Sequence, residues 1–550
     1  MMARSSLLLL ALVALSWSAG GQQAPYELSI IHINDFHARF EEVDTNSVTC
    51  DSSTGAVCVG GYARTVTVVK QLLAERTNPM YFNAGDNFQG TLWYNMHRWN
   101  ATVEFLNMLP ADAMTLGNHE FDHGLDGIIP FMERINSPVL LANVDNSDEP
   151  RFGNYRKSMV VERNGRKIGI IGVILRNMNE LTAAGSTGKL VFEDEVETVK
   201  AEAEVLKQQG IDIILVLSHC GLDTDREIAA HAGPEIDIII GGHSHTFLYT
   251  GEHGGIPGLA VDQYPVVVTQ QGGHKVLIVQ AAAYTKLVGD IVLFFDEAGI
   301  IQRWEGNPIY LSTSVVPDPE IVQALIPWKQ AIDEAGGRRI GSTSVNLLKS
   351  SCGYGECNLG SFVADSMVAA FIPLAEPGHW TYAAIGVIAV GGLRVNMFKG
   401  DISYMNLIEV LPFENMLVCV ELRGDRVLSM LEYAVEKARD EDRFNAANML
   451  QVSGLRVVYN VTNPVGQRVL AVEVLCYDCM VPKYESLQAL KYYRVVTNSF
   501  IAGGGDGFTV FPQYGRNTLN GPIDVDAFEK YIKEHSPVMQ GIDGRIKVHT

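Results

Sequence analysis

The sequence predicts a two-domain α/β protein, and three observations support this prediction. The chain has 550 residues, 47% of them hydrophobic, so it can bury a large core and exceeds the usual length of one domain. From about residue 26 to residue 310, short β-branched runs alternate with helix-like or loop segments, which is typical of sheets flanked by helices. A proline-rich start, a helical spacing of Ile321, Leu325 and Trp328, and two closing glycines then predict a helix at the domain boundary.

The N-terminal residues 1–20 are expected to be a secretory signal peptide. One Arg precedes an apolar run of about ten residues, and small residues follow at positions 18–20. A membrane span is the alternative, but the apolar run is short for one. The C-terminal residues lack the hydrophobic tail of a lipid-anchor signal. We therefore expect a secreted, extracellular protein without a membrane anchor.

The rest of the chain divides into three expected segments. Residues 25–316 form the first α/β domain, residues 317–336 the connecting helix, and residues 337–550 a second mixed α/β domain. The second domain is marked by the loop signals VGGLR, LPFEN and GGGDGF. No internal repeat is evident.

The eight cysteines fall into close pairs and leftovers, which in a secreted chain indicates local disulfides. The expected pairs are Cys50 with Cys58, Cys352 with Cys357, and Cys476 with Cys479. Cys220 and Cys419 lie far apart in the sequence, and we expect two buried free thiols there rather than a long-range bridge. Asn100 and Asn460 fit the pattern of glycosylation acceptors.

The charge balance limits the possible partners. The chain has 63 acidic and 42 basic residues, giving a formal net charge of −21. This argues against binding to nucleic acid or to an anionic membrane. An anionic substrate must be held by local cations.

Five separate apolar runs in the first domain each stop at an Asp, Asn or His. The runs are IIHINDFH, YFNAGDN, MTLGNHEFD, IILVLSHC and DIIIGGHSH. One such residue is commonly a turn former or a helix cap. Five together indicate a site, because α/β sheets bind ligands at the ends of several strands.

The residue types at these strand ends predict metal binding. Carboxylate, imidazole and amide ligands suit divalent Zn or Mn. The seven candidate ligands are too many for one tetrahedral ion, and two ions about 3.5–4 Å apart with a bridging carboxylate would use them all. These candidates are Asp35, His37, Asp86, Asn118, His219, His243 and His245.

His119 is left without a metal role, and Asp122 follows it by three residues. A histidine held by a carboxylate keeps a defined tautomer and can act as a general acid or bind a phosphate oxygen. Two metal ions would activate a water and neutralise phosphoryl charge. The residues alone therefore predict a phosphoester hydrolase.

The whole chain beyond the signal peptide resembles the secreted and cell-surface 5'-nucleotidase/apyrase family of the calcineurin-like metallophosphoesterase superfamily. The resemblance rests on NDFHARFEE, NAGDNFQGTLWY, TLGNHEFDHG, LSHCG, GGHSHTFLYTG, ECNLG, LPFEN, LQVSGLRVVY and GGGDGF, which occur in the family's order. The chain is similar to the apyrases of blood-feeding insects in particular. The resemblance implies a four-layer α/β/β/α metallophosphoesterase domain joined by a helix to an α/β nucleotide-binding domain that rotates during turnover.

The resemblance also implies roles for single residues. Asp35, His37 and Asp86 match ligands of one ion, and Asp86, Asn118, His219 and His243 match ligands of the other. His245 stands where relatives often have Gln or Asn near the first ion. His119 and Asp122 match the catalytic dyad. The expected substrate contacts are Arg39 at the phosphate, Phe413 and Phe500 on the two faces of the base, and Asp506 at the ribose, with Asn118 and Arg394 as further substrate-binding residues.

Two departures from the family pattern affect the expected substrate. Gly353 replaces an Arg in CGYGEC, and Ala389 replaces the Asn that contacts the base. AMP should suffer most because it has the fewest phosphates, so we expect hydrolysis of extracellular ATP and ADP, with an anti-platelet or purinergic role. Zn is the expected metal, with Mn, Ca or Mg as alternatives, and the protein is expected to be a monomer or a homodimer.

Two other functions stay open at this point. One is a 5'-nucleotidase that converts AMP to adenosine. The other is a secreted protein that sequesters nucleotides or binds integrins through Arg423-Gly424-Asp425. We expect this tripeptide to be a strand-to-helix turn with Asp425 as the N-cap.

Overall fold

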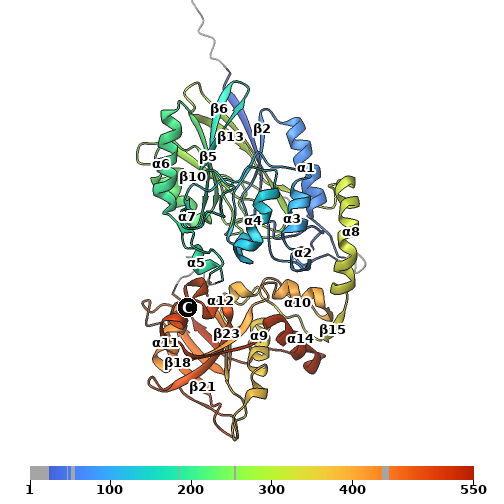
Figure 1. Cartoon of the computed structure of the whole chain (residues 1–550), viewed down its shortest axis with the longest axis vertical. Coiled ribbons are helices and arrows are strands. Elements are labelled where there is room, and N and C mark those ends of the chain that lie inside the picture. Colours follow the sequence, from blue (N-terminus) through green and yellow to red (C-terminus); the bar gives the residue numbers. More distant parts are fainter. Residues whose placement is uncertain are drawn as a thin grey trace, which may run out of the picture.

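The computed structural model describes residues 24–45, 47–50, 56–183, 185–252, 255–436, 445–446 and 448–550. The predicted signal peptide lies outside the described residues. The chain folds into two mixed α/β domains, one above the other in Figure 1, with helix α8 (Pro319–Gly336) along one side. In the described part of the chain, no helix has both the length and the apolar character needed to span a membrane.

The first domain contains two six-stranded sheets. One has the order β13-β12-β1-β2-β3, with β14 paired to β12. Its strands are β1 (Tyr26–Ile33), β2 (Pro79–Asn83), β3 (Ala113–Met114), β12 (Leu287–Phe295), β13 (Ile301–Gly306) and β14 (Ile309–Tyr310). β1, β2 and β3 are parallel to one another.

The second sheet has the order β10-β11-β9-β8-β6-β5. Its strands are β5 (Ser158–Arg163), β6 (Arg166–Ile174), β8 (Ile213–His219), β9 (Ile238–Ile240), β10 (Val266–Thr269) and β11 (Lys275–Val279). The inner strands β6, β8, β9 and β11 run parallel. Every residue of β8, sequence IILVLSH, is buried, as expected for a parallel strand covered on both faces.

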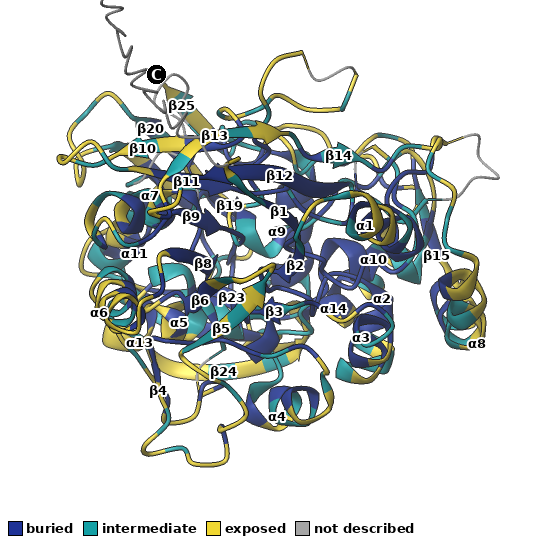
Figure 2. Ribbon diagram, turned by 90° about the horizontal axis from the view of Figure 1, so that it is seen from above, coloured by how far each residue is buried: buried dark blue, intermediate teal, exposed yellow. Residues whose placement is uncertain are grey.

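Helices cover the outer face of each sheet. α6 (Glu195–Gln208) and α7 (Leu222–His231) pack on the second sheet, and α1 (Tyr62–Glu75) packs on the first. Figure 2 shows these helices on opposite sides of the two sheets, with α3 (Trp99–Leu106) on the same side as α1, and α4 (Gly124–Arg134) beyond the edge strands β3 and β5. This is the four-layer α/β/β/α arrangement. Shorter elements lie in the connections: α2 (Leu92–His97), η2 (Asn118–Phe121), β4 (Val144–Asp145), α5 (Met178–Leu181) and β7 (Val191–Phe192).

The connecting helix begins as its sequence suggests. The Asp318 side chain accepts hydrogen bonds from the N–H groups of Glu320 and Ile321, and Pro319 is the first helical residue. The helix then runs beside α2 and α10 (Tyr404–Val410) and so lies against both domains.

The second domain also contains two main sheets. The larger has the order β19-β16-β23-β18-β24, made of β16 (Ile385–Ala389), β18 (Met416–Arg423), β19 (Leu450–Ser453), β23 (Tyr492–Asn498) and β24 (Arg516–Ile523). The smaller has the order β22-β21-β20-β25, made of β20 (Leu455–Asn460), β21 (Val469–Leu475), β22 (Tyr484–Ser486) and β25 (Ile546–His549). β15 (Arg339–Thr343) and β17 (Gly400–Ser403) form a separate pair. The remaining elements are α9 (Asn358–Ala369), η3 (Ile372–Leu374), η4 (Val390–Gly392), α11 (Gly424–Ala434), α12 (Ser499–Ala502), η5 (Gly505–Gly507), α13 (Val510–Tyr514) and α14 (Asp524–His535).

The cysteines pair as their spacing suggests. The structure has disulfides Cys50–Cys58, Cys352–Cys357 and Cys476–Cys479. Cys220 and Cys419 are free and buried.

The Arg-Gly-Asp tripeptide lies at a strand-to-helix turn, but the predicted cap was wrong. β18 ends at Arg423, and α11 begins at Gly424, so Arg423 takes the N-cap position and Asp425 lies in the first turn. The helix can start at Gly424 without an Asp cap because its first N–H groups, of Gly424 and Asp425, donate to the carbonyls of Lys491 and Ala489 at 2.8 and 2.9 Å. Arg423 Nε and Nη2 donate to the Asp425 carboxylate at 2.8 and 2.6 Å.

Candidate active site

The predicted ligands lie where parallel strands of the two sheets end. Asp35 follows β1 and Asp86 follows β2 in the first sheet, and Asn118 opens η2 after β3. His219 is the last residue of β8, and His243 and His245 follow β9 in the second sheet. The two sheets therefore contribute to one site from opposite sides.

Five of these residues have left-handed backbone conformations. The φ angles are 51° at Asp35, 50° at His37, 55° at Asp86, 71° at His243 and 53° at His245. This region is uncommon for residues other than glycine, and strained residues cluster at functional sites. Each loop turns sharply after its strand and directs its side chain into the site.

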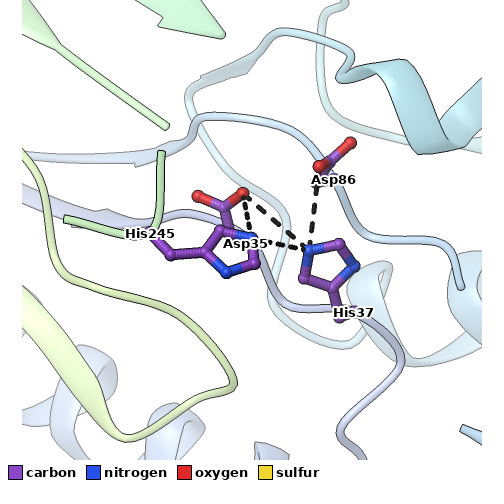
Figure 3. Close-up of side chains that lie close together, drawn as sticks. All are labelled: Asp35, His37, Asp86 and His245. Carbon is purple, nitrogen blue, oxygen red and sulfur yellow. Dashed lines mark hydrogen bonds and ion pairs between the residues drawn. The ribbon is translucent and has the colours of Figure 1, made fainter. Parts of the chain in front are cut away.

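The first group of candidate ligands consists of Asp35, His37, Asp86 and His245, whose ligand atoms all lie within 4.8 Å of one another. His37 Nε2 lies 3.0 Å from His245 Nε2, 3.9 Å from Asp35 Oδ1 and 3.7 Å from Asp86 Oδ2. His245 Nε2 lies 3.2 Å from Asp35 Oδ1. Figure 3 shows the four side chains converging, with His245 facing His37.

The second group consists of Asp86, His219 and His243, so Asp86 belongs to both groups. His219 Nε2 lies 3.2 Å from Asp86 Oδ2. Asn118 adds an amide oxygen, since its Oδ1 lies 2.9 Å from His243 Nδ1.

The donor atoms of both groups fit divalent cations. His219 Nδ1 is held by the Ala84 carbonyl at 2.7 Å, which aims Nε2 at Asp86, and within the described residues this buried Nε2 makes no hydrogen bond. A backbone carbonyl that fixes the ring in this way is typical of metal-ligating histidines. Two imidazole nitrogens that face each other at 3.0 Å, as in His37 and His245, also suit a shared cation.

Burial and charge set the protonation of the histidines. Burial lowers the pKa of His37 and of His245, and it lowers the pKa of His243 to about 3, so these rings are neutral as metal ligands must be. Burial also disfavours charge on His219, but the Asp86 carboxylate outweighs it and raises the pKa of His219 to about 10. Asp86 thus attracts positive charge to this position.

His119 and Asp122 form a close pair beside the ligands. His119 Nδ1 lies 2.7 Å from Asp122 Oδ2, and the His119 backbone N–H donates to Asp86 Oδ1 at 2.9 Å. Burial opposes charge on His119, but Asp122 and Asp86 together raise its pKa. The His119 ring is stacked on Phe413 of the second domain, with centroids 5.4 Å apart and planes at 12°.

The predicted substrate residues lie in three places. The Arg394 guanidinium lies 5.6 Å from the centre of the Phe413 ring, next to His119. Phe500 packs on Gly505, and Asp506 follows in η5, where its carboxylate approaches Gly391. Arg39 is buried apart from these, with Nη1 3.2 Å from Glu409 Oε1 and the guanidinium 5.1 Å above the Tyr284 ring.

The two departures from the family pattern differ in their surroundings. A Cβ at Gly353 would lie 2.0 Å from Asn445 Oδ1, so a side chain there would require the Asn445 side chain to move. Ala389 is the last residue of β16 and is buried.

Three residues that the sequence analysis did not identify support the site. Both oxygens of the buried Glu120 accept backbone N–H groups: Oε2 from Asp86 at 3.1 Å and from Gly117 at 2.6 Å, and Oε1 from Asn87 at 2.5 Å. Burial and the Asp86 charge raise the pKa of Glu120 to about 7. Glu120 thus ties the loop of Asp86 to the loop of Asn118.

Gln280 and Tyr284 support the histidine loop. The buried Gln280 donates to the Gly242 carbonyl at 2.9 Å and accepts from Ser244 Oγ at 3.1 Å and from the Thr246 N–H. The Tyr284 ring lies 5.4 Å from the His37 ring and 5.2 Å from the His245 ring. Gln280 directly follows β11, so the strand-end pattern that identified the ligands could have found it, whereas no sequence signal marks Tyr284.

Comparisons with known proteins agree with this architecture. Residues 28–247 match the family model of the calcineurin-like phosphoesterases, and residues 339–513 match that of the 5'-nucleotidase C-terminal domain. An apyrase from Tabanus yao is 46% identical over 525 residues, which cover 95% of this chain and 94% of that protein. A 5'-nucleotidase from Bos taurus is 34% identical, with 98% and 94% covered.

A solved structure agrees as well. The 5'-nucleotidase precursor from Thermus thermophilus has a TM-score of 0.85 and 33% identity, covering 95% of this chain and 99% of that one. The metallophosphoesterase domain, the nucleotidase C-terminal domain and the full-length similarity together show that this chain is a hydrolase of the 5'-nucleotidase/apyrase family.

Proposed function

We propose that this chain is a secreted nucleotide phosphohydrolase that uses two divalent metal ions to release phosphate from ATP and ADP. The observation that carries the proposal is the pair of ligand groups that share Asp86. Asp35, His37, Asp86 and His245 would hold one ion, and Asp86, Asn118, His219 and His243 the other. Their mixed carboxylate, imidazole and amide donors favour Zn or Mn, with Ca or Mg as alternatives.

When bound, the ions supply a water activated at neutral pH and neutralise phosphoryl charge. The chain's own residues do the rest. Asp122 holds His119 Nδ1 at 2.7 Å, which leaves Nε2 to give a proton to the leaving oxygen or to bind a phosphoryl oxygen. Arg394 brings positive charge to the same place. Arg39 Nε and Nη2 are buried and make no hydrogen bond in the described part of the chain, and a bound phosphate oxygen would satisfy them.

Nucleoside recognition falls to the second domain. Phe413 and Phe500 would hold the base, and Asp506 the ribose. Gly353 and Ala389 remove a cationic and a polar contact that family members use. Loss of one hydrogen bond to a charged group costs about 1.5–3 kcal/mol, and AMP, with one phosphate, has the fewest other contacts to offset it. ATP and ADP are therefore the preferred substrates.

AMP hydrolysis to adenosine is the second candidate, since the Bos taurus relative is named a 5'-nucleotidase. Integrin binding is disfavoured, because Arg423 and Asp425 pair with each other and Gly424 is buried.

Secretion is supported by the signal-peptide pattern and by the three disulfides. Asn100, on the exposed face of α3, is the better glycosylation candidate than the half-buried Asn460.

A substrate panel tests the proposal. Purified protein is given ATP, ADP, AMP or UDP-glucose with Zn, Mn, Ca or Mg, and phosphate release is measured with and without chelator. ATP and ADP should be the best substrates, and His119→Ala should abolish release. Absence of phosphate release from every nucleotide with every metal would refute the enzyme, and AMP as the best substrate would favour the second candidate.

A further inference from the structure

Two acid–base pairs join residues 409–414, the segment that carries Phe413, to the phosphoesterase domain. Glu409 pairs with Arg39 at 3.2 Å, and Glu414 pairs with Arg98 at 2.6 Å. We refer to these two pairs as the interdomain clasp. Asn95 Nδ2 also donates to the Pro412 carbonyl at 2.8 Å. Phe413 is therefore tied to the other domain on both sides.

The Arg98–Glu414 pair lies at the edge of the interface. The two side chains are 35% and 32% exposed. Arg98 Nη1 also lies 2.6 Å from His123 Nε2, and His123 Nδ1 lies 3.3 Å from the Tyr94 hydroxyl. The pair is thus part of a small polar network that includes residues beside the His119–Asp122 dyad.

Both residues of this pair have strained backbones. The φ angle is 53° at Arg98, between α2 and α3, and 54° at Glu414, directly after Phe413. Such conformations persist only where the surrounding contacts determine them. With these backbone conformations, the two side chains meet across the domain boundary.

The Arg39–Glu409 pair is buried instead. Both side chains are 1% exposed, and the Thr49 N–H donates to Glu409 Oε1 at 2.7 Å. Moving the two segments past each other within this buried contact would leave two buried charges without their partners, which is costly. The buried pair therefore opposes rotation of the second domain. The Arg98–Glu414 pair is partly exposed to solvent, so its two charges can be swapped by mutation without burying a charge.

The clasp determines where Phe413 and Arg394 lie. The Phe413 ring is stacked on His119, and the Arg394 backbone N–H donates to the carbonyl of Val410, inside the same segment, at 3.1 Å. A shift of residues 409–414 would move both side chains away from the dyad. We infer that Arg98 and Glu414 are positioning residues that act through residues 409–414, placing Phe413 and Arg394 against the active site for nucleotide binding. This inference rests on the proposed function.

A charge exchange tests the inference. The variants are Arg98→Glu, Glu414→Arg and the double variant with both changes, and the control is Arg151→Glu, which breaks the exposed surface pair with Asp126. Each single variant should raise the KM for ADP at least tenfold with kcat changed less, and the double variant should return KM to within threefold of the parent. Hydrolysis of bis(p-nitrophenyl) phosphate, which has no nucleoside for the second domain to bind, should change several-fold less than hydrolysis of ADP.

A second measurement needs no activity. Spin labels at Lys200→Cys and Lys530→Cys, exposed positions in different domains, report the interdomain distance, and the two free cysteines are buried. The single variants should broaden the distance distribution, and the double variant should narrow it again. Unchanged distances in the single variants, or a double variant no closer to the parent than the single variants, would overturn the inference. An inactive parent with these distance changes would refute only the proposed function.

Discussion

Replacing Glu120 with Gln should weaken metal binding without preventing folding. The Glu120 carboxylate accepts three N–H groups from the loops of Asp86 and Asn118. Gln keeps the volume and one oxygen, so it can retain the two bonds at Oε2, from Asp86 and Gly117. Its NH₂ group then faces the Asn87 N–H, and two donors meet where a charged acceptor stood.

The size of the effect follows from these contacts. One charge-assisted hydrogen bond contributes about 1.5–3 kcal/mol, and the lost charge weakens the other two bonds, so the total is about 2–4 kcal/mol. If this cost falls on the ligand loops, metal affinity drops by about 30-fold to 1,000-fold, at about 1.4 kcal/mol for each factor of ten.

The assay is competition for Zn with a chromophoric chelator at pH 8.5, where Glu120, with its pKa raised to about 7, is ionised. The control is Glu227→Gln, on the exposed surface of α7, which should leave affinity unchanged. A folded Glu120→Gln protein that binds Zn within threefold of the parent would show that the carboxylate does not hold the ligand loops.

Three further results are expected. Asp86→Ala removes the carboxylate common to both ligand groups, so phosphate release from ADP should fall at least about 1,000-fold; release within tenfold of the parent would contradict this. Gly172→Ala would place a Cβ 2.1 Å from the Leu140 carbonyl oxygen and should lower the free energy of unfolding in urea by about 3 kcal/mol, whereas Gly272→Ala, with no atom within 4 Å, should cost under about 1 kcal/mol; equal losses would refute the steric argument. Burial, with Glu414 and Asp526 adding to it, raises the pKa of Asp524 to about 8, so the native state holds a proton that the unfolded chain releases near pH 4, and this carboxyl should make the free energy of unfolding fall as the pH rises from about 4 to 8. Asp524→Asn should remove that contribution, and identical pH profiles of parent and variant would contradict it.

The sequence predicted the architecture well because its strongest signals are local. Apolar runs that end in Asp, Asn or His identified strands whose carboxyl ends meet, and parallel pairing brings those ends together. Short cysteine spacings also indicated the disulfides, because two cysteines only a few residues apart remain close in space whatever the rest of the fold. The roles given to the seven ligands and to the substrate residues stay predictions.

Contacts between distant segments could not be predicted. Glu409 meets Arg39 across 370 residues, and nothing near either residue in the sequence indicates the other. Gln280 and Glu120 act by binding backbone groups of loops whose shape depends on the finished fold. Asp425 has the right residue type for an N-cap, but the helix begins at Gly424, two residues earlier than that cap requires, because carbonyls of Lys491 and Ala489 accept its first N–H groups.

The division of the ligands between two sheets has a consequence for the stability of the protein. Asp35 and Asp86 follow strands of one sheet, and His219 and His243 lie at strand ends of the other. Bound ions would therefore cross-link the two sheets of the domain. Because ligands that bind only the native state stabilise it, each tenfold rise in free metal above the dissociation constant would add about 1.4 kcal/mol per site. Resistance to heat and to proteases would then depend on the metal content of the surrounding fluid, and a chelating fluid would shorten the protein's lifetime as well as stop its chemistry.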